Sequence, residues 1–294
     1  MMDARELTLQ LGGRWYGSYG KCPCPVCQPE PRPKQNALTL RNGDDGRLLA
    51  HCKKLDCAFA NILAAAGVTP GGTSAPDPAR LAQRERDRRA EAERRARQAL
   101  TCWREAQPLA GTPAETYLRW RGITCALPAT LRFHPACWHG AIARPLPALV
   151  ALVEGCDDIA VHRTYLRADG SGKADVEPAK AMLGGTAGGA VRLSASTGRL
   201  VVAEGIETAL SLASGLLSGP VAIWAALSTS GMRSLRLPVT PGQLTIASDG
   251  DAAGHAAAQA LAERAHALGW RVDLLPAPEG RDWNDILIAK GGPA

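Results

Sequence analysis

The sequence is poor in aromatic residues and contains no long apolar run. Only 4% of its 294 residues are aromatic, including two phenylalanines and four tyrosines. No apolar stretch approaches the ~20 residues that a membrane-spanning helix requires. The first residues, MMDARELTLQLGGRW, also lack the apolar segment of a secretory signal. We therefore expect a cytoplasmic protein with no membrane association.

Other features are also missing. The sequence has no G-x-x-x-x-G-K-[ST] motif, so a helicase activity would have to come from a separate chain. No internal repeat is visible. The formal net charge is only +6 and the pI about 8.9, a mild basic excess. Such a balance permits a polyanionic partner without requiring one.

Cysteine, in contrast, is concentrated at one end of the chain. Of nine cysteines, the group Cys22, Cys24, Cys27, Cys52 and Cys57 lies in the first fifth. In a reducing compartment such crowding favours a metal site over disulfides. We expect the scattered remainder to be ordinary small side chains, mostly buried: Cys102, Cys125, Cys137 and Cys156.

The spacing of the clustered cysteines predicts a zinc ribbon. Cys24-x2-Cys27 and Cys52-x4-Cys57 are two chelating pairs, and four thiolates satisfy one structural Zn²⁺ ion. Between the pairs, NALTLRNGDDGRLLAHC reads as two strands joined by an Asn-Gly/Asp-Gly turn. Cys22 and His51 are additional donors, and either is able to replace a neighbouring cysteine as the ligand.

Composition divides the chain into five segments. GVTPGGTSAPDP is typical of a linker, and ARLAQRERDRRAEAERRARQAL is a strong helix former rich in arginine. A solvated helix with acid–base pairs is favoured over a nucleic-acid-binding arm. We predict a zinc-ribbon domain at 1–66, a linker at 67–79, a basic helix at 80–100, a mixed α+β region at 101–195 and an α/β domain at 196–294.

The last third has the pattern of an α/β fold. RLVVA, VAIWAA, QLTIAS and RVDLLPA are almost wholly apolar and are bounded by turns, as buried strands are. Helical stretches lie between them at 206–216 and 251–268, with a shorter one near 230–236. This alternation predicts a mostly parallel sheet flanked by helices.

Acidic residues follow the ends of these strands. Glu204 comes after LVVA, Asp249 and Asp251 come after LTIAS, and Asp282 and Asp285 lie in RDWNDIL. The carboxyl ends of parallel strands meet at one sheet edge, where gathered carboxylates repel one another unless a cation binds them. Their oxygens suit Mg²⁺ or Mn²⁺, which in turn hold phosphates. For any single acid the alternative is a helix N-cap, and Asp249 or Asp251 fits that description.

These segments resemble a known family. LVVAEGIETALSL followed by LTIASDGDAAGHAAAQAL resembles the Toprim domain of bacterial DnaG-type primases, type IA and II topoisomerases and some nucleases. HRTYLRADGSGKADVEPAKAMLGG resembles the basic segment before the primase Toprim domain, and LLPAPEGRDWNDILIAKGG their closing acidic segment. A zinc ribbon, a linker and a Toprim core follow one another in primase order. The whole is most similar to Toprim primase-like proteins of phages, plasmids and other mobile elements.

The resemblance implies roles for individual residues. Glu204 would be the Toprim glutamate, an acid/base group or metal ligand, and Asp249 and Asp251 the metal-binding Asp-x-Asp pair. Asp282 and Asp285 would form a third acidic cluster at the magnesium site. The residues implied to contact nucleotide phosphates are Arg163, Lys173 and Lys180. Where many primases carry an aspartate, this chain has Thr208, with Glu207 just before it.

The function implied is that of a DNA primase. Such an enzyme joins nucleoside triphosphates on a single-stranded DNA template by Mg²⁺-dependent phosphoryl transfer, together with a separate helicase or replication protein. A Toprim nuclease and a non-catalytic single-strand-binding accessory protein are the alternatives. The residues Trp15, Tyr16, Tyr19, Lys21 and Arg41 suit base stacking and phosphate contacts, although a small core needs aromatic residues too.

Overall fold

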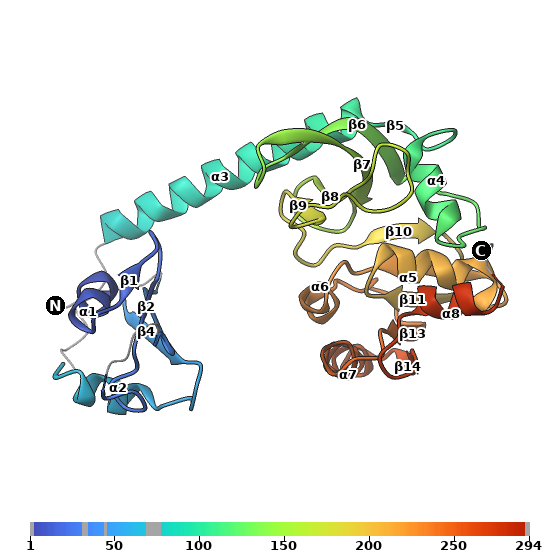
Figure 1. Cartoon of the computed structure of the whole chain (residues 1–294). Coiled ribbons are helices and arrows are strands. Elements are labelled where there is room, and N and C mark those ends of the chain that lie inside the picture. Colours follow the sequence, from blue (N-terminus) through green and yellow to red (C-terminus); the bar gives the residue numbers. More distant parts are fainter. Residues whose placement is uncertain (1–2, 31–34, 44–45, 69–77, 292–294) are drawn as a thin grey trace. The chain divides into compact units, whose positions relative to one another are not determined.

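The computed structural model describes residues 3–30, 35–43, 46–68 and 78–291. The chain divides into two compact units, Met1–Arg89 and Ala90–Ala294, and we describe each by itself (Figure 1). Within the described residues, no helix combines the length and the apolarity needed to cross a bilayer.

The first unit is a small sheet that shares one core with two short helices. Helix α1 (Ala4–Gln10) begins at Asp3, whose carboxylate forms a reciprocal capping box with Glu6. Strands β1 (Arg14–Trp15), β2 (Gly20–Cys22), β3 (Leu38–Asn42) and β4 (Leu48–Cys52) pair antiparallel in that order, and α2 (Phe59–Ala65) follows. Leu7, Leu38, Leu40 and Ile62 form its core. The predicted hairpin is therefore present as β3 and β4, with residues 44–45 of its turn outside the described ranges.

Helix α3 (Pro78–Glu105) is longer at both ends than the predicted basic helix 80–100. Its middle is exposed, and Glu91 forms ion pairs with Arg94 at 2.7 Å and Arg95 at 2.8 Å, as expected for a solvated helix. The helix continues beyond residue 100 because Ala99 and Cys102 are buried in the core of the second unit. Most of the predicted linker, residues 69–77, lies outside the described ranges.

The second unit begins with an antiparallel sheet. Its strands are β5 (Gln107–Pro108), β6 (Leu131–His139), β7 (Arg144–Val153), β8 (Ala160–Tyr165) and β9 (Lys180–Leu183), paired in chain order. Helix α4 (Pro113–Trp120) lies between β5 and β6 in the chain and buries Tyr117 and Leu118. This is the mixed α+β region that the sequence predicts between residues 101 and 195.

The C-terminal sheet is parallel except at one edge. In chain order its elements are β10 (Val191–Ser194), β11 (Arg199–Ala203), α5 (Ile206–Ser211), the π-helical turn η1 (Leu212–Leu216), β12 (Val221–Ala225), α6 (Thr229–Ser234), β13 (Gln243–Ser248), α7 (Ala252–Ala267), β14 (Arg271–Pro276) and α8 (Trp283–Ala289). The spatial order is β10-β12-β11-β13-β14, and only β10 runs antiparallel. The domain boundary predicted at residue 196 leaves β10 outside this sheet. The reason is that β10 pairs with β12, which is distant in the sequence, and no local sequence pattern indicates that pairing.

Successive side chains of β11 point to opposite faces of this sheet, and different helices cover each face. Leu200 and Val202 on β11 join the core beneath α6 and α7. Val201 and Ala203 point the other way, into a core shared with α4, α5 and the antiparallel sheet. The antiparallel sheet and α4 therefore lie against one face of the C-terminal sheet, which Figure 1 shows as two stacked layers.

Candidate functional site

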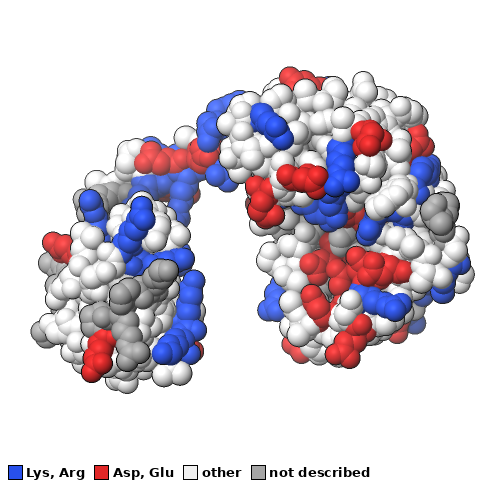
Figure 2. Space-filling view, viewed as in Figure 1, with Lys and Arg blue, Asp and Glu red and all other residues white. Residues whose placement is uncertain are grey.

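Acidic side chains meet at the carboxyl edge of the C-terminal sheet. Ala203 and Ala247 are register partners on the adjacent parallel strands β11 and β13, so Glu204 and Asp249 leave the sheet on the same side. Burial and the charges of Asp249 and Asp251 raise the pKa of Glu204. Burial and the charge of Asp282 raise the pKa of Asp249. We call these four residues the acidic edge, and Figure 2 shows acidic side chains gathered on this part of the second unit.

The backbone around the acidic edge has one unusual conformation and several close contacts. Leu227, just after β12, has a φ of 72°, the left-handed region that non-glycine residues rarely adopt, and its N–H donates to the Glu204 carbonyl at 2.7 Å. Thr208 Oγ1 donates to Asp249 Oδ1 at 3.3 Å. Gly250 lies so close to Pro278 that a Cβ would collide with the Pro278 carbonyl oxygen. These contacts hold the loops after β11, β12 and β13 together.

Some of the predicted ligands also cap helices. Asp251 accepts a hydrogen bond from the Gly254 N–H at 2.6 Å and is the N-cap of α7. Asp282 and Asp285 form a reciprocal capping box at the start of α8. Of the two acids proposed as alternative caps, Asp251 therefore has that role, whereas Asp249 does not cap α7.

The donor chemistry of the acidic edge fits Mg²⁺ or Mn²⁺, since carboxylate oxygens are the ligands that these ions prefer. A bound cation would also relieve the repulsion that, after burial, raises the pKa values of Glu204 and Asp249. Across the described ranges, however, no three carboxylate side chains bring one oxygen each within 4.8 Å of one another.

Two substitutions separate the capping role of Asp251 from its charge. Asp251→Ala removes the bond to Gly254 and should lower the free energy of unfolding by about 1 kcal/mol, whereas Asp251→Asn retains a capping oxygen and should cost much less. If Asp251 also binds metal, Asp251→Asn should lose Mg²⁺-dependent activity despite its stability. Urea unfolding and an activity assay on both variants measure the two effects. Full activity in Asp251→Asn would leave Asp251 only its capping role.

A compact group of basic residues lies beside the acidic edge. Lys173 Nζ is 3.2 Å from Glu207 Oε1, and Lys180 Nζ is 3.0 Å from Glu207 Oε2. The Tyr117 hydroxyl donates to Glu207 Oε1 at 2.7 Å. Lys180 is also near enough to the acidic edge to lower the pKa values of Glu204 and Asp249, against the larger effect of burial. Both predicted lysines are thus in one cluster, which we call the lysine pair.

The third predicted phosphate-binding residue lies elsewhere. Arg163 donates to the backbone carbonyls of Trp138 at 3.1 Å and Met182 at 3.4 Å, and its guanidinium lies 5.7 Å from the Tyr165 ring centroid. Successive residues of a strand point to opposite faces, so Arg163 faces away from its neighbour His162, whose pKa responds to Lys180 and Glu207. The structure does not bring Arg163 into the group formed by the lysine pair.

Comparison with known proteins identifies part of the chain. Residues 199–292 match the family model of the Toprim domain. These residues are a Toprim domain. Residues 93–193 match a domain of unknown function (DUF7146), which contains α4 and β5 to β9. No match was found among curated proteins.

Several solved primase structures are similar to the chain at low identity. The Aquifex aeolicus primase, with its zinc-binding and RNA polymerase domains, is 14% identical with a TM-score of 0.39, over 95% of this chain and 77% of that one. A DNA primase domain from Pseudomonas aeruginosa is 20% identical with a TM-score of 0.32, over 55% of this chain and 48% of that one. The RNA polymerase domain of Mycobacterium tuberculosis primase DnaG is 17% identical with a TM-score of 0.36, over 68% of this chain and 79% of that one. The chain thus spans about half of the Pseudomonas domain.

Sequence reasoning missed three residues beside the Toprim acids. Glu207 is buried on α5 and binds the lysine pair, Tyr117 reaches it from α4, and His162 on β8 is buried nearby. Burial and the charge of Lys180 lower the pKa of His162 to about 4, and its Nδ1 has no hydrogen-bond partner. A glutamate in the otherwise uncharged segment IETALS was a usable signal for Glu207. No sequence signal indicated Tyr117, because it lies 90 residues before its partner Glu207 in the chain.

The predicted cysteine cluster is assembled in the first unit. Cys24, Cys27, Cys52 and Cys57 place their sulfur atoms within 4.8 Å of one another, and the sulfurs of Cys27 and Cys52 are 3.6 Å apart. Tetrahedral zinc with Zn–S bonds of ~2.3 Å needs sulfurs about 3.8 Å apart, so the donor set fits Zn²⁺.

The two reserve donors lie outside the cysteine cluster. Cys22 is buried in the core, where burial and the neighbouring Cys24 raise its thiol pKa to about 12. His51 is exposed and lies 3.9 Å from Asp56. Of the remaining cysteines, Cys102 and Cys137 are buried as expected, whereas Cys125 and Cys156 are only partly buried.

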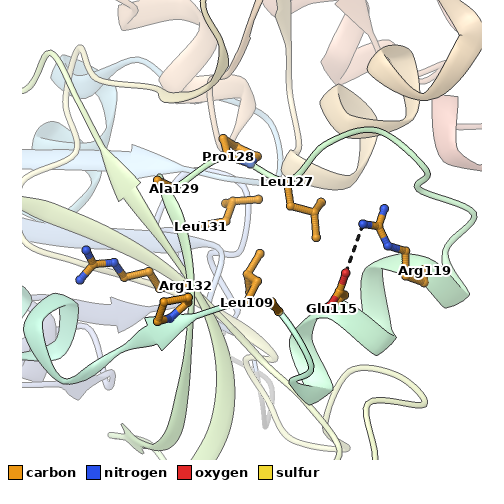
Figure 3. Close-up of a pocket in the computed structure, with 10 residues that line it drawn as sticks. Leu109, Glu115, Arg119, Leu127, Pro128, Ala129, Leu131 and Arg132 are labelled. Carbon is orange, nitrogen blue, oxygen red and sulfur yellow. Dashed lines mark hydrogen bonds and ion pairs between the residues drawn. The ribbon is translucent and has the colours of Figure 1, made fainter.

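A surface pocket of about 400 Å³ lies apart from these residues, between α4 and the start of β6 (Figure 3). Leu109, Leu127 and Leu131 form its apolar part, and Glu115 pairs with Arg119 at 3.2 Å at its edge. Arg119 also donates to the carbonyls of Ile123 and Cys125, so its guanidinium is engaged in the fold. The pocket contains none of the predicted site residues, and we assign it no ligand.

Proposed function

We propose that this chain is a primase-like nucleotidyltransferase that joins nucleoside triphosphates on single-stranded DNA. The observation that carries the proposal is the pairing of opposite charges at one sheet edge. The Toprim acids lie beside the partly exposed side chains of the lysine pair, and Lys180 acts electrostatically on both Glu204 and Asp249. A metal–triphosphate complex has the complementary distribution of charge, with a cation for the acids and phosphates for the lysines.

Each part of the site has a role in this proposal. Glu204, Asp249 and Asp251 would hold Mg²⁺ or Mn²⁺, with Asp282 and Asp285 nearby. When bound, the metal would neutralise part of the triphosphate charge. Lys173 and Lys180 would bind phosphate oxygens of the nucleotide. The alternative role for Glu204 is to accept the proton of the attacking hydroxyl group in place of binding the metal.

The first unit offers a surface suited to the template. The rings of Tyr16 and Tyr19 are stacked with centroids 5.4 Å apart, and Lys21 Nζ lies 5.9 Å from the Tyr16 centroid. Arg14 lies 5.5 Å from the same ring, whose residue is 46% exposed. Trp15 packs partly against the core. Exposed aromatic rings with adjacent cations bind single strands by stacking and phosphate contact. We propose single-stranded DNA as the partner here, and a helicase of a mobile replicon as a further partner.

Incorporation of labelled nucleotides tests the proposal. The full chain is incubated with Mg²⁺, labelled ribonucleoside or deoxyribonucleoside triphosphates and unlabelled single-stranded DNA. Labelled oligomers that depend on both template and metal are expected. Shortening of an end-labelled template would indicate the nuclease alternative. Template binding without either reaction would indicate an accessory protein, and both of these results would contradict the proposal.

A further inference from the structure

One buried carboxylate holds both members of the lysine pair. The Glu207 side chain is 8% exposed, whereas the Lys173 and Lys180 side chains are 37% and 40% exposed. The lysines come from separate places in the chain, Lys173 from the loop before β9 and Lys180 from β9 itself. Each Glu207 oxygen takes one ammonium group, and Tyr117 fixes Oε1 from a third element. The carboxylate therefore joins the Toprim domain to the region before it.

The charges of this cluster leave a cationic excess. Burial would raise the pKa of Glu207, but Lys180, Lys173 and Tyr117 outweigh it, so the pKa lies well below its usual range and Glu207 is ionised. Tyr117 is neutral because burial and Glu207 raise its pKa far above 10. His162 is neutral at pH 7 because burial and Lys180 lower its pKa to about 4. Two ammonium groups thus face one carboxylate.

Further charges surround this cluster. Lys180 also interacts with Glu204 and Asp249 of the acidic edge, and Asp282 acts on Tyr117. The other cations are Arg121, which acts on Tyr117 and Lys173, and Arg163, which acts on His162. Burial, followed by the charge of Lys180, lowers the pKa of Lys173, and Glu207 acts in the opposite direction. Removing the Glu207 charge would therefore make Lys173 easier to deprotonate and leave two like charges without their shared partner.

We propose that Glu207 is a positioning residue that fixes the ammonium groups of Lys173 and Lys180 for the phosphates of an incoming nucleotide. The inference rests on the proposed function and deepens it. Lysine has a flexible four-carbon stem, so an unanchored lysine loses side-chain entropy when it binds phosphate. Anchoring by a buried anion removes most of that loss before the ligand arrives. Each ammonium group has three N–H donors and contacts one Glu207 oxygen, so donors remain for the ligand.

Glu207→Gln tests the proposal because it keeps size and an acceptor for Tyr117 but removes the charge. Binding of inorganic triphosphate with Mg²⁺, measured by calorimetry on the full chain, should weaken by about tenfold, the worth of one charge-assisted hydrogen bond. In the incorporation assay, KM for nucleotide should rise by a similar factor with kcat within about twofold. The alkaline limb of the pH profile of kcat/KM should move to lower pH, because Lys173 loses the anion that keeps it protonated.

Glu115→Gln is the matched control, since Glu115 is also an ion-paired glutamate of the second unit but lies at the pocket of Figure 3. It should leave triphosphate affinity and the pH profile unchanged. Tyr117→Phe keeps the Glu207 charge and should weaken binding by a smaller factor; it also serves if Glu207→Gln does not fold. Unchanged triphosphate affinity in the folded variants would overturn the inference. Absence of nucleotide incorporation with triphosphate binding still dependent on Glu207 would contradict only the proposed function.

Discussion

Asp249→Asn should abolish Mg²⁺-dependent nucleotide incorporation while leaving the protein at least as stable as the native chain. Asp249 is half-buried, accepts from Thr208 at 3.3 Å and does not cap α7, so the substitution removes charge with little change in shape. Loss of a metal-binding carboxylate at a phosphoryl-transfer site is expected to lower kcat by about a hundredfold or more. Steady-state incorporation measures this effect directly.

The difference in stability between Asp249→Asn and the native protein should depend on pH. Burial and Asp282 raise the pKa of Asp249 in the folded state, so the ionised carboxylate destabilises the fold once the pH exceeds that pKa. Asp249→Asn removes this cost, and its melting temperature without metal should exceed that of the native protein at pH 7. The difference should shrink as the pH falls through the raised pKa of Asp249, because the carboxyl group of the folded native protein is then protonated and the cost is lost.

Asp273→Asn provides the control, because Asp273 lies on β14 of the same sheet and pairs with exposed Gln243 at 3.1 Å. It should change neither activity nor the pH dependence of melting. Full metal-dependent incorporation by Asp249→Asn would show that the acidic edge is not the metal site, and the Toprim acids would then have only structural roles.

Replacing Cys27 or Cys52 with serine should unfold the first unit and leave the second folded. Zinc binding in small domains is coupled to folding, with apparent free energies of roughly 10–16 kcal/mol, which exceeds the stability that a core of this size supplies. The native full chain should contain one zinc ion, measured by elemental analysis, and the variants none. Hydrogen exchange should show lost protection in β2 to β4, whereas α7 and β13 in the second unit keep theirs.

Cys22→Ala distinguishes the four proposed ligands from their neighbour. Cys22 is buried but lies outside the group of sulfurs within 4.8 Å, so this variant should retain one zinc ion and lose only the packing of a small side chain. Loss of zinc from Cys22→Ala, or retention of zinc by Cys52→Ser, would show that a different set of donors binds the metal.

Local patterns indicated much of the secondary structure and the four-cysteine cluster. The apolar runs RLVVA and QLTIAS became β11 and β13 because a continuous run of apolar residues is stable only when both sheet faces are covered. The paired spacing of the cysteines likewise indicated the four sulfurs that lie together, since each pair spans a single turn. Glu204 and Asp249 were predicted at one edge because parallel neighbours end on the same side.

Only the tertiary structure shows how the lysine pair is assembled. The pairing of Lys173 and Lys180 depends on Glu207, and the bond from Tyr117 joins α4 to α5 across 90 residues. The opposite orientation of Arg163 follows from its register on β8, and β10 belongs to the C-terminal sheet because it pairs with β12. Neither is visible in sequence, because a salt bridge or a non-consecutive strand pairing depends on distances that only the packed chain sets. Local sequence patterns thus indicated the buried strands of the C-terminal sheet and the acids that follow them, whereas packing decided which charges meet, how far α3 extends and which sheet β10 joins.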